Sequence, residues 1–108
     1  MIRRYLFVCG KNRQRSPTAE QLFSQFDGLD VLSAGIRRDS DEQLNGELVE
    51  WADMIFVMEK RQLTFVQSNF REQLLGTQVI NLSIPDRFEF MEDELVDLLR
   101  VKMKRFLP

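Results

Sequence analysis

The sequence contains no histidine and only one cysteine among its 108 residues. The lack of histidine excludes a Ser-His-Asp triad, a Cys-His pair and imidazole metal ligands. One cysteine can neither close an internal disulfide nor supply the ligands of a zinc finger. Cys9 must therefore either pack as a small apolar residue or react as a free thiol, which needs a reducing compartment.

Long apolar runs are also missing. The runs Tyr5–Cys9 and Met54–Met58 have five residues each, whereas a membrane span takes about 20. Arg3 and Arg4 precede the first run as they would in an export signal. The run is shorter than the roughly 7–15 apolar residues of such a signal, and no small-residue cleavage site follows it. We predict a cytoplasmic protein with no membrane partner.

Charge is unevenly distributed along the chain, although the net charge is only −2. Residues 1–38 carry seven bases and three acids, whereas residues 39–59 carry seven acids and no base. The acidic block is typical of a solvated helix face. The acidic overall balance argues against general nucleic-acid binding, so we expect nucleic acid at most as a substrate. The bases Lys11, Arg13 and Arg15 gather near Cys9.

Hydrophobic patterning predicts alternating strands and helices within one domain, residues 1–108. The expected strands cover 3–8, 29–34, 54–58 and 77–82, and the expected helices cover 17–26, 41–51, 63–74 and 91–107. Ser16 is expected to cap the first helix. Regular alternation predicts an α/β fold of three layers, with a four-stranded parallel sheet in the order 2-1-3-4 and helices on both faces.

The segment from Cys9 to Glu20 lies between the first strand and the first helix, where open α/β sheets bind ligands. Backbone N–H groups of such a loop, together with a helix N-terminus, form an anion site. Gly10 permits close backbone approach, and Asn12 tolerates a left-handed conformation. We therefore predict a phosphate-binding loop. The expected binding residues in this loop are Gly10, Lys11, Asn12, Arg13, Gln14 and Ser16.

A thiol on this loop suits phosphoryl transfer. Nearby cations and a helix N-terminus favour the thiolate form of Cys9, and Arg15 offers a planar fork to two phosphoryl oxygens. This pair suits in-line displacement with a phosphocysteine intermediate. Ser16 can donate a hydrogen bond to the sulfur. Asp86, after the fourth strand, is the candidate general acid and the later activator of water. No metal or cofactor is expected.

These residues resemble a known family. The segment 9–20 strongly resembles the phosphate loop of low-molecular-weight protein tyrosine phosphatases. It consists of Cys9, five intervening residues and then Arg15-Ser16-Pro17-Thr18-Ala19-Glu20. The resemblance continues in family order through Ser33-Ala34-Gly35 and residues 52–58 to Ile84-Pro85-Asp86. It implies that Cys9 is the nucleophile, Arg15 the phosphate clamp, Ser16 the thiolate partner and Asp86 the general acid. It also implies that Asn12 holds the loop.

The chain departs from the family pattern at several places. Gln14 stands where a second cysteine usually protects the nucleophile, and Arg87 replaces the proline that usually follows the acid. Phe88 occupies a position where an aromatic residue often lines the cleft, so it is a candidate substrate contact. The long insert that usually follows Gly35 and forms one wall of the cleft is nearly missing. The resemblance therefore implies a shallower and more open site.

The function favoured by these features is hydrolysis of a phosphomonoester, first of all protein phosphotyrosine. Hydrolysis of a small metabolite or a nucleic-acid end is an alternative, motivated by the missing wall and by Lys11 and Arg13. A phosphocysteine carrier of sugar-transport type would need neither Arg15 nor Asp86. An inactive phosphate-binding adaptor is a further alternative. Arsenate reduction needs further cysteines, which this chain lacks.

Overall fold

The four strands form one parallel sheet. The computed structural model describes all residues, 1–108. The strands are β1 (Arg3–Cys9), β2 (Leu29–Gly35), β3 (Met54–Val57) and β4 (Gln78–Asn81), and they lie in the order β2-β1-β3-β4. All neighbours are parallel, and Cys9 pairs with Gly35 at the carboxyl ends of β1 and β2. The predicted sheet order is confirmed.

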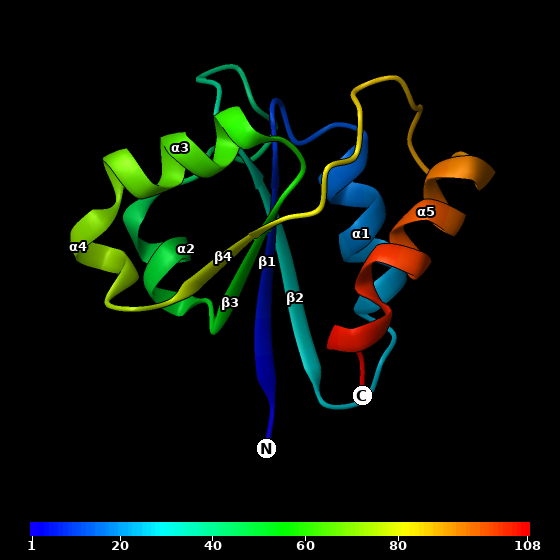
Figure 1. Ribbon diagram of the computed structural model, residues 1–108, viewed down its shortest axis with the longest axis horizontal. Coiled ribbons are helices and arrows are strands. Elements are labelled where there is room, and N and C mark those ends of the chain that lie inside the picture. The colour runs from blue at the N-terminus through cyan, green and yellow to red at the C-terminus, as the bar shows by residue number, and fades with distance from the viewer.

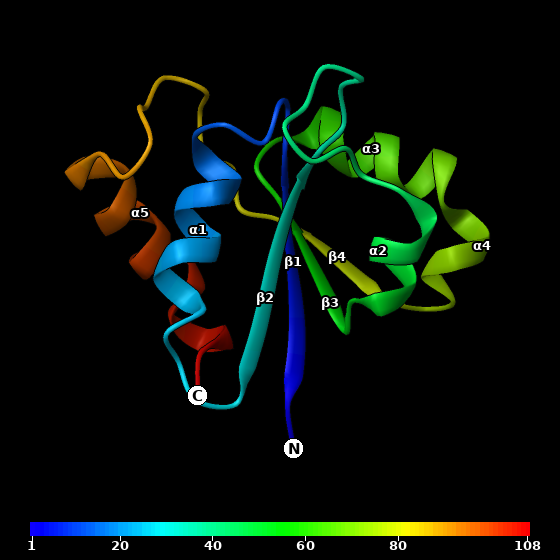
Figure 2. The same ribbon diagram turned by 180° about the vertical axis from the view of Figure 1, so that it is seen from behind.

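Helices cover both faces of this sheet. α1 (Arg15–Phe23) and α5 (Asp93–Met103) lie on one side, and α2 (Gly46–Trp51), α3 (Lys60–Asn69) and α4 (Arg71–Leu74) lie on the other (Figures 1 and 2). A short 3₁₀ turn, η1 (Lys104–Phe106), ends the chain. No helix is both long enough and apolar enough to cross a bilayer. The predicted three-layer α/β architecture is confirmed.

The side chains of the strands alternate between the two faces of the sheet and pack into two hydrophobic cores, one on each face. Phe7 and Phe56 point toward α1 and α5, with their ring centroids 5.1 Å apart. Leu6, Ile55 and Val57 point to the opposite face and pack in the second core. Successive side chains of a strand point to opposite faces, and both faces are covered here, which explains the continuous apolar runs in β1 and β3.

Several helix boundaries differ from the predicted ones. α1 begins at Arg15 and ends at Phe23, so Ser16 lies inside the helix and does not cap it. Its hydroxyl lies instead beside the Cys9 sulfur. The predicted helix over 41–51 begins only at Gly46, where the Asn45 side chain accepts a hydrogen bond from Leu48 N. In the first case the Ser16 hydroxyl has a tertiary partner. In the second, Asp41 N donates to Lys11 O and Leu44 N donates to Gly35 O, which holds residues 41–44 outside the helix.

The predicted boundaries of the two later helices, over 63–74 and 91–107, also differ from the structure. The stripe over 63–74 is divided between α3 and α4, because the backbone leaves the helical conformation at Phe70. The last helix begins at Asp93 and not at 91, since Met91 has φ +61° and its N–H donates to Thr18 Oγ1. Such a left-handed residue cannot continue a helix.

Gly35 allows the loop after β1 to pack against β2. A Cβ at Gly35 would lie 2.8 Å from both the backbone nitrogen of Asn12 and the carbonyl oxygen of Gly10, and it would also clash with Ser40 Oγ. The Gly35 backbone meanwhile bonds to Glu42 O and Leu44 N, at 2.8 Å each, so it cannot retreat. Only glycine fits between these two loops.

We expect Gly35→Ala to lower the free energy of unfolding by about 1–3 kcal/mol, because the added methyl group overpacks rigid backbone. The variant should also weaken phosphate binding, since relief of the clash displaces the Cys9 loop. Urea unfolding and calorimetric titration with phosphate measure the two effects. Gly10→Ala is the stability control, because a Cβ there meets only Arg61 Nη2 at 3.9 Å. Equal stability of the two variants would contradict the packing argument.

Candidate active site

Cys9 lies at the carboxyl end of β1, at the base of a small pocket. Its side chain is buried, and its Sγ lies 2.9 Å from Ser16 Oγ. The pocket has a volume of about 80 Å³. The residues that line it are Cys9, Gly10, Lys11, Gln14, Arg15, Arg37, Arg61 and Asp86. The fold therefore brings the predicted nucleophile, cation and acid to one place.

The loop after Cys9 carries a row of unpaired hydrogen-bond donors. Backbone N–H groups of residues 10–16 donate to no backbone or side-chain acceptor of the protein. Asn12 adopts φ +58° and so reverses the loop toward the N-terminus of α1. Free N–H groups around a left-handed turn, next to the positive end of a helix, form an anion-binding site.

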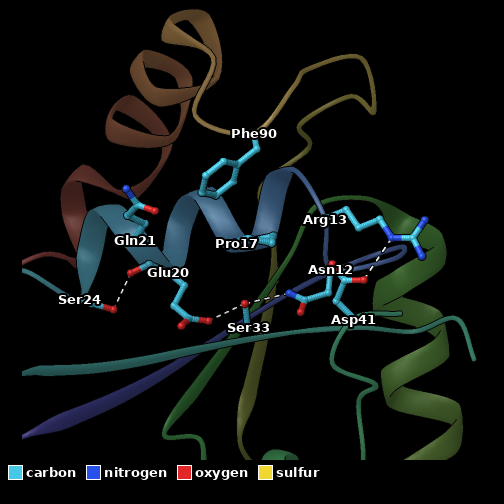
Figure 3. Close-up of a pocket in the computed structure, with 9 residues that line it drawn as sticks. All are labelled: Asn12, Arg13, Pro17, Glu20, Gln21, Ser24, Ser33, Asp41 and Phe90. Atoms are coloured by element: carbon cyan, nitrogen blue, oxygen red, sulfur yellow. Dashed lines mark hydrogen bonds and ion pairs between the residues drawn. The ribbon is translucent and has the colours of Figure 1, made fainter. Parts of the chain in front are cut away.

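A chain of buried hydrogen bonds supports this loop from behind. Asn12 Nδ2 donates to Ser16 Oγ at 3.0 Å. It also donates to Ser33 Oγ at 2.8 Å, and Ser33 Oγ donates to Glu20 Oε1 at 2.6 Å (Figure 3). Ser16 Oγ also lies 3.3 Å from Ala34 O. Ser16 has one proton, and a thiolate has none. When Cys9 is ionised, Ser16 must therefore be the donor in its bond to sulfur.

Arg15 is buried and its charge is matched. Its Nη1 donates to Ile84 O at 2.8 Å and pairs with Glu59 Oε2 at 2.8 Å, while Nη2 lies 3.7 Å from Asp86 Oδ1. The side chain is 2% exposed. A buried guanidinium needs such a carboxylate partner. Glu59 therefore orients Arg15 within the pocket.

Asp86 lies on the loop between β4 and α5, and its side chain is 58% exposed. Two hydrogen bonds donated by its backbone N–H groups hold this loop in place. Ile84 N donates to Met58 O at 2.9 Å, and Met91 N donates to Thr18 Oγ1 at 2.9 Å. The acid is thus free to meet solvent or substrate, although the loop that carries it is anchored to β3 and α1.

The expectation that Phe88 lines the cleft is corrected by the structure. Phe88 is 4% exposed and belongs to the core between the sheet and α5, so it does not line the pocket. Arg87 covers its outer face with the guanidinium carbon 4.6 Å from the ring centroid, and also pairs with Glu94 at 3.0 Å. The exposed ring nearby is Phe90, which faces a separate hollow beside α1 (Figure 3).

Arg13 also lies outside the Cys9 pocket. Its Nε pairs with Asp41 Oδ1 at 3.3 Å and its Nη2 donates to Asp39 O at 3.0 Å, and it lines the separate hollow shown in Figure 3. The Asn12 side chain faces the same hollow. Of the predicted loop residues, Gly10, Lys11 and Gln14 line the pocket itself.

Three charged residues of the site were missed by the sequence analysis. Arg37 follows β2, and Glu59 and Arg61 follow β3. All three come after strands whose carboxyl ends share one edge of the parallel sheet with Cys9. That position was the available signal, because ligands of open α/β sheets bind at this edge.

Asp39 links two of the cations around the pocket. It lies 3.5 Å from Lys11 Nζ and 3.2 Å from Arg37 Nε. Desolvation acts to raise the pKa of the Asp39 carboxyl, but the charges of Lys11 and Arg37, together with hydrogen bonds, outweigh it and hold the pKa below its usual value. A carboxyl with a lowered pKa stays ionised through neutral and mildly acidic pH, so this bridge persists there.

Comparison with solved structures places this arrangement in a known fold. The tyrosine phosphatase Wzb from Escherichia coli K30, in complex with phosphate, superposes with TM-score 0.75 at 21% identity, covering 98% of this chain and 96% of Wzb. SP-PTP, a low molecular weight protein tyrosine phosphatase from Streptococcus pyogenes, superposes with TM-score 0.79 at 16% identity, covering 97% and 91%. This chain has the low molecular weight protein tyrosine phosphatase fold.

Another similar structure carries a different activity in its name. The YwlE arginine phosphatase from Geobacillus stearothermophilus superposes with TM-score 0.71 at 23% identity, covering 96% of this chain and 93% of YwlE. No family model and no curated protein matches the sequence. The phosphatase fold is thus shared by proteins named for two different phosphorylated residues, so the fold alone does not choose a substrate.

We expect Glu59→Gln to lower the free energy of unfolding by about 1–3 kcal/mol, because the buried Arg15 charge loses its carboxylate partner while Glu59 itself is partly exposed. Added phosphate should raise the melting temperature of this variant more than that of the wild type, since the oxyanion replaces the lost partner. Differential scanning calorimetry with and without phosphate measures both. A phosphate-independent deficit would mean that Arg15 does not face the anion site.

Proposed function

We propose that this protein is a cysteine-dependent phosphomonoester hydrolase that acts on protein phosphotyrosine through a phosphocysteine intermediate. One observation carries the proposal. The Cys9 sulfur, a loop of unpaired N–H groups and a buried arginine line the same pocket. This set can hold three phosphoryl oxygens while sulfur attacks phosphorus.

In the first step the Cys9 thiolate attacks phosphorus and the bond from phosphorus to the ester oxygen breaks. The protonated Asp86 carboxyl gives its proton to the departing oxygen. Loop N–H groups and the Arg15 guanidinium bind the three remaining oxygens, where charge is concentrated in the transition state. The products of this step are the phosphocysteine and the free alcohol or phenol.

In the second step a water molecule attacks the phosphocysteine. The ionised Asp86 takes a proton from this water as its oxygen bonds to phosphorus, and the phosphorus–sulfur bond breaks. Ser16 donates its hydrogen bond to the sulfur, 2.9 Å away, which stabilises the departing thiolate. The cycle needs no group beyond the side chains named and water.

The tyrosine assignment is supported by the relatives named for that activity. We also propose that the protein works in the cytoplasm, because the thiol of Cys9 must stay reduced and Gln14 offers it no protective disulfide partner. We propose nucleic acid only as a substrate, hydrolysed at a phosphorylated end. The steps above require no metal or cofactor.

A second candidate is hydrolysis of a small, non-protein phosphoester. The observation that favours it is the lining of the pocket, which contains no aromatic side chain to pack against a tyrosine ring. A phosphocysteine carrier or an inactive adaptor is less favoured. Neither needs Asp86 at the mouth of the pocket, nor Arg15 buried beside it.

Replacement of the nucleophile gives the primary test. Cys9→Ser should lower turnover of phosphotyrosine peptides at least 10⁴-fold, because a serine hydroxyl without an adjacent base does not attack phosphorus. Phosphate binding should persist, since the N–H groups and Arg15 remain. Steady-state assays and calorimetric titration check the two statements. Wild-type turnover no higher than that of Cys9→Ser would favour the adaptor.

The role of Asp86 is tested with leaving groups of different basicity. Asp86→Ala should slow hydrolysis of a phenyl phosphate by about 100-fold or more, because the departing phenoxide needs a proton. Hydrolysis of a nitrophenyl phosphate should fall much less, since its leaving group is stable as an anion. A series of substituted phenyl phosphates gives the dependence of rate on leaving-group pKa. Equal losses across the series would remove Asp86 from the acid role.

A further inference from the structure

The size of the Cys9 pocket leaves most of the substrate outside it. Its volume of about 80 Å³ is far below the roughly 300–1,000 Å³ of pockets that enclose a whole small ligand. The pocket therefore encloses the phosphate group, and the remainder of the substrate must lie on the rim. Rim residues then decide which phosphoesters bind well.

Three exposed cations form this rim, and they surround Gly10. We call Lys11, Arg37 and Arg61 the rim cations. Arg37 N donates to Gly10 O at 3.0 Å, and Arg61 Nη2 lies 3.9 Å from the position of a Cβ on Gly10. Their side chains are 39%, 57% and 63% exposed, respectively. Their charged ends can therefore reach a group bound beside the phosphate.

The rim cations are incompletely neutralised. Asp39 is shared between Lys11 and Arg37. Glu59 is shared between Arg61, at 3.6 Å, and the buried Arg15, at 2.8 Å. Glu59 is closer to Arg15 than to Arg61. The Glu59 carboxylate therefore neutralises Arg15 more than it neutralises Arg61.

A bound phosphate satisfies Arg15 and the loop N–H groups but does not supply a partner for each rim cation. Asp86, the remaining carboxylate of the pocket, must be protonated to act as an acid and then carries no charge. The carboxylates that face the three rim cations are therefore Asp39 and a share of Glu59, and arginines on an exposed rim bind further carboxylates and phosphates well.

We propose that the substrate carries a second anionic group beside the scissile phosphate, and that Arg37 and Arg61 bind it. This inference rests on the phosphatase function proposed above and names the substrate class for it. The second anion is a carboxylate next to the phosphorylated side chain of a peptide, or a second phosphate on a small molecule. Both present the same chemistry to the rim.

Two matched substrate pairs test this proposal and tell the two sources apart. The first pair is a phosphotyrosine peptide flanked by Asp and Glu and the same peptide flanked by Asn and Gln. The second pair is fructose 1,6-bisphosphate and fructose 6-phosphate. In the pair that resembles the true substrate, kcat/KM of the more anionic member should exceed that of the other member by about three- to tenfold, the gain that two exposed ion pairs provide. The pair that shows the larger preference identifies the source.

The preference should depend on the rim arginines. In the double variant Arg37→Gln with Arg61→Gln, the ratio of kcat/KM within the pair should fall close to one. The matched control is Arg71→Gln with Lys102→Gln, which removes the same charge from α4 and α5. Neither residue lines the pocket or forms an ion pair, so this control should keep the wild-type ratio. If the arginine variant does not fold, about 0.5 M NaCl should lower the wild-type ratio instead, by screening.

Ratios near one for both pairs in the wild type would overturn the proposal, and so would a preference that survives loss of the rim arginines. If that variant does not fold, a wild-type preference that survives added salt would overturn it. Hydrolysis of p-nitrophenyl phosphate, which has no second anion, separates this failure from failure of the proposed function. Hydrolysis that depends on Cys9, with ratios near one, would refute the second anion alone. The absence of any Cys9-dependent hydrolysis would refute the phosphatase function and the inference with it.

Discussion

A single buried positive charge holds the site of this protein together. The Arg15 guanidinium contacts the carbonyl of Ile84 and the carboxylate of Asp86, both on the loop between β4 and α5. It also contacts the carboxylate of Glu59, at the start of α3. Burial of that charge is unfavourable unless those partners are in place. Arg15 also begins α1, directly after the Cys9 loop. The requirement to match its charge therefore brings three separate segments to one edge of the sheet.

Charged residues, and no aromatic side chain, line the Cys9 pocket. The connection from Gly35 to α2 has ten residues between the strand and the helix, 36–45, and Phe88, the residue expected to supply an aromatic contact, is buried. The rim that remains is built from Lys11, Arg37 and Arg61. Proteins that share this fold are named as tyrosine and as arginine phosphatases, so the fold by itself does not fix which phosphorylated group is bound.

Patterning predicted the strands well and the helix ends poorly. Strands β1 and β3 were predicted nearly to the residue, because a buried parallel strand is a continuous apolar run. Ser16 was placed at a helix cap and lies inside α1, since its hydroxyl bonds to a sulfur that only the folded chain brings near. The predicted helix over 63–74 is divided at Phe70, where its apolar stripe alone carries no signal of a break.

The sequence by itself determined the sheet order and the positions of Cys9 and Asp86 after parallel strands at one edge of the sheet, because these follow from local pattern and from the geometry of parallel sheets. Only the tertiary structure decided which charges meet. Arg13 lies outside the pocket, although it is only four residues from Cys9 in the sequence. Arg61, which follows β3 and is distant in sequence, lines the pocket. The direction of a long charged side chain depends on carboxylates supplied by distant segments, and no local pattern records them.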